Sequence, residues 1–177
     1  MSFPTPVQVR GQAERIIATF RIAGVTGMNL DLLTRRNRLR AAIRAVVSNA
    51  LDNDALNRLL LRADIPWTFV ALVRAYLNYA RQIGLPFTSS TVQDALEHHA
   101  SVLRALMELF RVKFDPSIDG IDPQEVDEKR QSLIERTRRA LLSLLDGIDD
   151  LTSDQVLRVC TIWLKRRFVL IFMRATP

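Results

Sequence analysis

Helical spacing of apolar side chains between Pro66 and Gly84 constrains the fold more than any other feature of this sequence. Apolar residues recur there every three or four positions: Phe69, Val70, Val73, Leu77 and Ala80. This spacing places them on one face of a helix. Proline suits the first helical turn, and glycine tolerates the left-handed conformation that follows a last turn. The pattern therefore predicts an amphipathic helix over residues 66–83.

The same spacing continues through most of the chain. Further helices are predicted over residues 10–22, 31–50, 52–64, 89–98, 101–114, 123–146 and from residue 152 onward. Only six glycines and seven prolines interrupt the 177 residues, and leucine, arginine and alanine lose little side-chain freedom in a helix. The predicted fold is all-α, an irregular multi-helix bundle of about eight helical segments.

Short polar side chains predict where several helices begin, because their oxygens accept hydrogen bonds from the first free backbone N–H groups. The expected caps are one of Asp52–Asp54, one of Ser89 and Ser90, Ser101, and one of Thr152, Ser153 and Asp154.

Two helices have an expected inward face. In 31–50 the inward positions are Leu32, Leu39, Ile43, Val46, Val47 and Ala50, opposite a face with Arg35, Arg36, Arg38, Arg40 and Arg44. In 123–146 the expected packing line is Ile134, Thr137, Leu141, Leu144 and Ile148, with steps of three and four.

The chain divides by composition into three expected parts. Residues 1–9 form an irregular lead-in, residues 10–159 a helical domain, and residues 160–177 an apolar basic tail. The net charge is +6, but the tail alone holds Lys165, Arg166, Arg167 and Arg174 and no acid. Residues 1–159 therefore carry only +2, which weakens the case for a nucleic-acid-binding or membrane-binding domain.

One cysteine cannot form an internal disulfide, which favours a reducing compartment and a cytoplasmic protein. No uncharged apolar run of membrane-spanning length is present, and the first residues lack the pattern of a signal peptide.

The residues that most often carry chemistry have simpler structural interpretations here. Adjacent side chains of His98 and His99 point about 100° apart on a helix, so one metal ion is poorly served by both. Cys160 is expected to be a buried or incidental thiol rather than a nucleophile, and Tyr76, Tyr79 and Trp67 to be packing residues. The sequence thus predicts no catalytic, cofactor-binding or metal-binding residue.

Phosphate binding is weakly supported as well. The arginines from Arg35 to Arg44 have no interleaved aromatic residue for base stacking, and a solvated helix face explains them. Gly24 and Gly27 are the closest approach to a glycine-rich phosphate loop, but no predicted strand precedes them.

Residues 66–116 contain three unusual motifs in succession: Arg-Ala-Tyr-x-x-Tyr, then Gln-x-Gly-x-Pro-Phe, then Leu-Phe-x-x-Lys-Phe-Asp-Pro. This stretch resembles the helical region of the large NAD-specific glutamate dehydrogenases, which lies upstream of their catalytic part. The resemblance covers residues 37–159, including the segment LSLLDGIDDLTSDQVLR.

The resemblance implies a non-catalytic helical fragment of an enzyme that oxidatively deaminates L-glutamate to 2-oxoglutarate with NAD. The family's catalytic lysines and its Rossmann domain have no counterpart here, so this chain alone is expected to be inactive and to bind no cofactor. Its implied partners are the remainder of the parent enzyme and its oligomer.

The resemblance stops at Cys160. Codons for residues 160–176 can be chosen that, read one base earlier, encode Leu-His-Asn-Leu-Val-Glu-Ala-Thr-Phe-Arg-Thr-Asn-Phe-Tyr, which is the type of continuation that the family has. The hypothesis is that the tail arises from a shifted reading frame, and that residues 160–177 are dispensable for folding.

Two alternatives remain open. The chain could be a free-standing helical protein-interaction module that uses residues 123–146, or a basic protein that binds membranes or nucleic acid through its tail.

Overall fold

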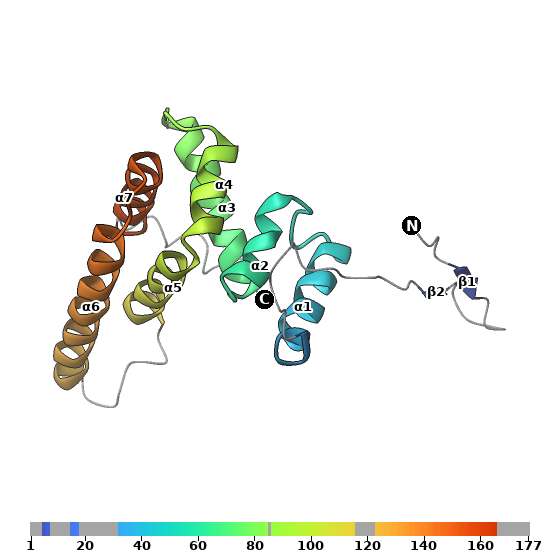
Figure 1. The fold of residues 1–177 in the computed structure, drawn as a ribbon. Coiled ribbons are helices and arrows are strands. Elements are labelled where there is room, and N and C mark those ends of the chain that lie inside the picture. The colour runs from blue at the N-terminus through green and yellow to red at the C-terminus, as the bar shows by residue number, and fades with distance from the viewer. Residues whose placement is uncertain (1–4, 8–14, 18–31, 85, 116–122, 166–177) are drawn as a thin grey trace. The chain divides into compact units, whose positions relative to one another are not determined.

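A computed structural model describes residues 5–7, 15–17, 32–84, 86–115 and 123–165. The chain forms two compact units, Met1–Leu32 and Leu33–Pro177. The described residues of the second unit form seven α-helices and one 3₁₀ helix, so the predicted all-α fold is confirmed (Figure 1). They are α1 (Leu32–Val47), η1 (Ala55–Arg58), α2 (Leu59–Arg62), α3 (Trp67–Gln82), α4 (Ser89–His98), α5 (Ala100–Phe114), α6 (Pro123–Asp146) and α7 (Leu151–Lys165).

The first unit contains a small antiparallel strand pair, β1 (Thr5–Val7) and β2 (Arg15–Ile17), in which Pro6 faces Ile16. The helix predicted over 10–22 is therefore wrong at β2, and the lead-in 1–9, predicted to be irregular, contains β1. β-branched side chains explain the difference, because Ile16 and Ile17 favour a strand over an isolated short helix. Phe20 and the expected loop at Gly24, Gly27 and Asn29 lie outside the described residues.

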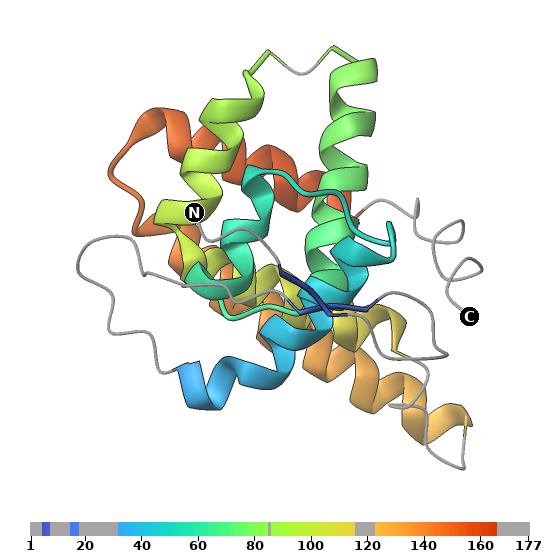
Figure 2. The same cartoon turned by 90° about the vertical axis from the view of Figure 1, so that its right-hand side faces the viewer.

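The core of the helical unit is one apolar cluster to which every described helix of that unit except η1 contributes buried residues. Helix α5 packs against α4, α6 and α7, as Figures 1 and 2 show for α6 running beside it. Its buried residues are Val102, Leu103, Leu106, Leu109 and Val112. Two rings of the cluster, Phe69 on α3 and Phe110 on α5, meet edge to face with 6.1 Å between their centroids.

Helix α3 follows its prediction closely. Pro66, which has an extended backbone conformation, precedes the first residue of the helix. Gly84 follows the helix with φ +84°, a backbone conformation that would be strained in a residue with a side chain. Phe69, Val70, Val73 and Ala80 are buried as expected, and Leu77 is partly buried against the same core. Trp67 also packs against the core at the first turn.

Only part of the cap prediction is confirmed. Asp54 caps η1, accepting a hydrogen bond from the Leu56 backbone N–H at 3.0 Å. Thr88, one residue before the expected serines, caps α4 by accepting from the Thr91 N–H at 3.1 Å. Asp150 caps α7 by accepting from the Ser153 N–H at 2.8 Å, in place of the three residues predicted. His99 is the residue before α5 and its side chain forms no capping hydrogen bond, so the predicted Ser101 cap is wrong.

The inward face of α1 is rotated from the predicted one. Within residues 35–47, for which burial is described, Ala42 and Ala45 are buried, whereas Ile43 is 42% exposed and Val47 is 79% exposed. The reason is that Arg35 and Arg38 bind backbone carbonyls at and just after the end of α2, which turns their side of α1 toward that segment. Two small side chains therefore face the core where larger ones were expected.

Helix α6 packs along nearly the expected line. Leu141 and Leu145 are fully buried, and Ile134 and Ile148 pack against the core. The prediction is wrong at Leu144, which is 38% exposed, because its neighbour Leu145 takes the inward position.

Helix α7 continues beyond the expected end of the helical domain, to Lys165. Thr161 is buried, and its hydroxyl donates to the Leu157 carbonyl at 2.8 Å. The first residues of the expected tail 160–177 thus belong to α7. That the tail is dispensable for folding stays a prediction. Residues 166–177 lie outside the described residues.

Candidate functional site

The most connected polar site surrounds Arg74 on α3. Its guanidinium is nearly buried, and it donates from Nε to Asp54 Oδ2 at 2.6 Å and from Nη2 to Asp54 Oδ1 at 2.7 Å. Nη2 also donates to Asn57 Oδ1 at 3.2 Å and to the Asp52 carbonyl at 3.4 Å. Such a two-pronged pair fixes direction as well as distance.

Asp54 holds two elements at once. One of its oxygens accepts from the Leu56 N–H while both face Arg74, so the cap of η1 is tied to α3. The hydrogen bonds from Arg74 hold the pKa of Asp54 below its ordinary value, against the opposing effect of burial. This arrangement is a structural clasp between residues 52–57 and the middle of α3.

Arg74 was missed by sequence reasoning, although a signal existed. It lies four residues after Val70 and three before Leu77, on the apolar face of α3. An arginine on an apolar face needs a buried partner. The acid-rich Asp52-Asn53-Asp54 break was the obvious source of one.

A second clasp joins α1 to the end of α2. Arg35 donates from Nη1 to the Leu61 carbonyl, and Arg38 donates from Nη1 to the Asp64 carbonyl. Arg38 Nη1 also lies 2.7 Å from Asp64 Oδ1. Asp64 has φ +54°, a left-handed conformation that turns its carbonyl and carboxylate toward the two arginines.

Arginines also secure the last two helices. Arg130 of α6 donates to the Lys113 carbonyl at 3.1 Å and to the Asp115 carbonyl at 2.9 Å, where α5 ends and free carbonyls accumulate. Arg158 of α7 donates from Nε to Asp154 Oδ1 at 2.7 Å and from Nη2 to Asp146 Oδ1 at 3.0 Å. These bonds tie α6 to α5 and α7 to α6.

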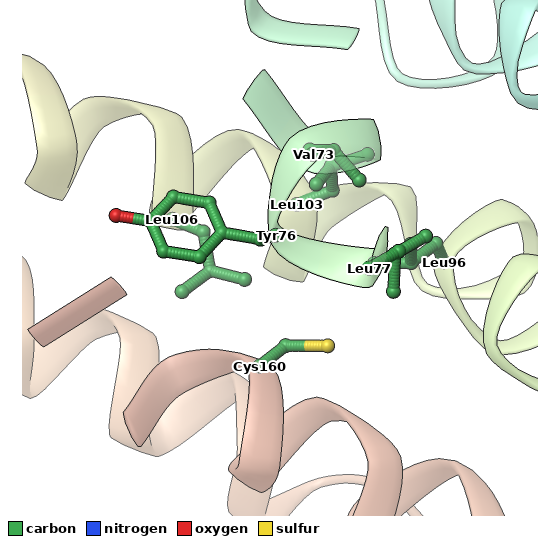
Figure 3. Close-up of a pocket in the computed structure, with 7 residues that line it drawn as sticks. All are labelled: Val73, Tyr76, Leu77, Leu96, Leu103, Leu106 and Cys160. Carbon is green, nitrogen blue, oxygen red and sulfur yellow. The ribbon is translucent and has the colours of Figure 1, made fainter. Parts of the chain in front are cut away.

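A small apolar cavity of about 20 Å³ lies between α3, α4, α5 and α7 (Figure 3). It is lined by Val73, Tyr76, Leu77, Leu96, Leu103, Leu106 and Cys160. The volume is that of one water molecule, but its lining offers no polar surface to hold one. The cavity is too small for a metabolite.

The Cys160 thiol and the Tyr76 hydroxyl beside this cavity both have a raised pKa. Burial raises the pKa of the Cys160 thiol to about 12, so the thiol stays protonated at neutral pH and is a poor nucleophile. The Tyr76 hydroxyl is buried without a hydrogen-bond partner among the described residues, and burial raises its pKa. In Figure 3 this hydroxyl points away from the Cys160 sulfur.

The side chains of the two adjacent histidines lie in different surroundings. His98 is exposed, and its Nδ1 lies 2.7 Å from the Asp94 carbonyl one turn earlier. His99 is half-buried between α4 and α5, near the Asp150 carboxylate. Among the described residues no three potential metal ligands of the His, Cys, Asp and Glu types lie together.

The arginine run from Arg35 to Arg44 does not act as one surface. Arg35 and Arg38 form the clasp to Asp64, whereas Arg36, Arg40 and Arg44 are exposed and form no ion pair among the described residues. Gly24 and Gly27 lie outside the described residues. No helix in the described part of the chain is long and apolar enough to cross a membrane.

Comparison with known proteins places these helices in context. A family model described as "Glutamate dehydrogenase, helical motif 3" matches residues 51–116, which extend from the break before η1 to just beyond the end of α5. No solved structure matches this chain significantly.

Three curated relatives are described as NAD-specific glutamate dehydrogenases. The protein of Pseudomonas aeruginosa is 33% identical over 156 residues, which are 88% of this chain and 9% of the relative. That of Halomonas elongata is 32% identical over 142 residues, 80% of this chain and 8% of the relative. That of Mycobacterium tuberculosis is 30% identical over 122 residues, 69% of this chain and 7% of the relative.

The chain therefore spans less than a tenth of the length of these relatives. The match to the Pseudomonas protein is longer than residues 37–177, so it includes part of residues 1–36. The expected extent of the resemblance, 37–159, was too short, because no quoted motif lies near the N-terminus.

Proposed function

Because this chain belongs to the family of large NAD-specific glutamate dehydrogenases, we propose that it is a non-catalytic helical segment that supports the catalytic core of such an enzyme. The parent reaction is the oxidative deamination of L-glutamate to 2-oxoglutarate and ammonia, with NAD as the hydride acceptor. The observation that carries the proposal is the match of residues 51–116 to a family motif that is itself named as helical.

The polar chemistry of the described helices supports this role. Several arginines bind backbone carbonyls and carboxylates of neighbouring elements. Arg74 binds the Asp54 carboxylate, and Arg130 binds carbonyls at the end of α5. Such contacts fix the relative positions of helices. A rigid helical support is what a catalytic part needs from a segment that contributes no reacting group.

The proposal predicts that this chain alone neither binds NAD tightly nor reduces it in the presence of glutamate. Calorimetric titration with NAD and an assay for NADH formation test both expectations. Micromolar NAD affinity would overturn the non-catalytic assignment.

A positive test uses the coding DNA downstream of this chain. We expect that a neighbouring frame encodes lysine-rich and glycine-rich dehydrogenase motifs. In a polypeptide that joins both parts, Arg74→Met should lower thermal stability and kcat while leaving KM for NAD nearly unchanged. The matched control is Arg81→Met on the same helix, since Arg81 is exposed and forms no ion pair among the described residues. Equal effects of the two substitutions would contradict a supporting role for the clasp.

A second candidate function is a free-standing protein-interaction module. It is favoured by α6, which exposes Leu133 (44%) and Leu144 (38%) on one flank of its packing line. A downstream region without dehydrogenase motifs would favour this candidate over the first.

A further inference from the structure

The outer face of α1 combines positive charge with exposed apolar surface. It consists of Arg36, Arg40, Ile43, Arg44 and Val47. At 100° per residue these five positions fall within an arc of about 100°. The face lies opposite the side on which Ala42 and Ala45 are buried.

This face has no charge partner in the described part of the chain. Arg36, Arg40 and Arg44 are exposed and form no ion pair there, and α1 itself contains no acidic residue. Val47, at 79%, is the most exposed large apolar side chain of the described residues. The combination of three cations with Ile43 and Val47 suits an acidic protein surface that also offers apolar side chains.

A surface of this kind occurs on the same chain, at the corner between α6 and α7. The corner consists of Leu144, Asp146, Asp149, Asp150 and Leu151. Leu151 is 70% exposed, second only to Val47 among the described residues. Asp149 is exposed and forms no ion pair in the described part of the chain. Asp146 and Asp150 keep charge at the corner while they bind Arg158 and cap α7.

We propose that the outer face of α1 docks on the α6–α7 corner of a second copy of this chain. Arginine meets aspartate, and Val47 and Ile43 meet Leu151 and Leu144. Figures 1 and 2 show α1 and the corner well apart within the helical unit, so a single copy does not bring its own two surfaces together. Both surfaces are small, so the contact is weak and salt-dependent. This inference does not depend on the proposed support of a catalytic core.

The test is sedimentation velocity of the full chain from about 10 µM to about 1 mM. We expect reversible association that weakens as salt rises and the charges are screened. Arg40→Glu should weaken it by about tenfold or more, because the new carboxylate faces aspartates. Asp149→Arg should weaken it similarly, because it faces arginines. Circular dichroism checks that each variant retains its helices.

Mixing the two variants gives the decisive measurement. In each variant alone the altered side chain faces like charges, whereas in an equimolar mixture the carboxylate of Arg40→Glu can face the guanidinium of Asp149→Arg, so the mixture should recover the association that each variant alone loses. Arg81→Glu, a charge reversal on the exposed side of α3, is the matched control and should leave association unchanged.

Three outcomes would overturn the proposal. They are a monomer at every concentration, a mixture no better than the single variants, or single variants that associate as strongly as the unaltered chain. The last result would assign association to the apolar tail 160–177, which all variants share.

Discussion

At the scale of single residues, the cavity region contains two side chains whose surroundings do not match their chemistry. The Tyr76 hydroxyl is buried but has no hydrogen-bond partner among the described residues. Cys160 lines an apolar space that a larger side chain would fill. Tyr76 on α3 and Cys160 on α7 both line the cavity. Substitutions at these two positions therefore change the packing of the core and no ion pair.

Tyr76→Phe should raise the free energy of unfolding by about 1 kcal/mol, because it removes a buried donor that loses its hydration on folding and gains nothing in return. Urea unfolding followed by circular dichroism measures the change. Tyr79→Phe is the control on the same helix, since Tyr79 has an interaction partner and should show no gain. Equal gains for both substitutions would mean that ring packing, rather than the hydroxyl, is responsible.

Cys160→Leu should raise the free energy of unfolding by about 0.5 kcal/mol, because filling a cavity of about 20 Å³ recovers about 24 cal/mol per Å³. The shifted frame considered for the tail encodes leucine in place of Cys160 and asparagine in place of Ile162, which is 51% exposed. The shift fills the space beside Cys160 and replaces an exposed apolar side chain at Ile162 by a polar one, but it also places histidine at the buried position of Thr161. A fall in the thermal midpoint of Cys160→Leu would show overpacking and remove this support for the frame hypothesis.

At the scale of elements, the sequence predicted helices well and their contacts less well. The stripe of α3 was predictable because Phe69, Val70 and Val73 have the helical period and lie between strong start and stop signals. The face of α1 was not, because its orientation depends on Arg35 and Arg38 reaching carbonyls that are 26 residues away in sequence. The same limit explains Asp150, which competes with three later residues of similar capping chemistry.

The Asp54 clasp gives a pH dependence with a definite sign. The folded pKa of Asp54 is lower than its ordinary value of 3.8, so its contribution to stability is present above that value. The contribution is lost as pH falls through the lower, folded pKa. Thermal midpoints measured from pH 6 down to about pH 2 should therefore fall less steeply in Asp54→Asn than in the unaltered chain. Asp149→Asn serves as the control and should follow the unaltered chain; parallel curves for all three proteins would contradict the clasp.

At the scale of the whole molecule, α7 carries the described fold beyond the expected boundary of the helical domain. The helical domain was expected to end at Val159, because the family resemblance stops there. The structure continues the helix to Lys165 and buries Thr161. Amphipathic character persists across that point, and a core accepts apolar residues whose exact shape was not matched to it.

A chain that ends at Val159 should therefore unfold at a lower temperature than one that ends at Lys165, because it loses Thr161 and the cavity-lining Cys160. Thermal unfolding of both chains and of the full chain, under one set of conditions, makes the comparison. Equal midpoints for the two shortened chains would restore the original expectation that the whole tail 160–177 is dispensable. Midpoints alone do not reveal association, so light scattering is recorded in parallel.

The contacts that hold α1 also determine how readily this helix opens locally in the folded protein. Among residues 35–47 of this helix, whose burial the structure describes, only Ala42 and Ala45 are buried, and the arginine contacts to Leu61 and Asp64 lie near solvent. Little free energy therefore separates its docked state from an open one. In native-state hydrogen exchange the amides of α1 should lose their protection first, as a cooperative group, while those of α5 exchange only when the helical unit unfolds globally.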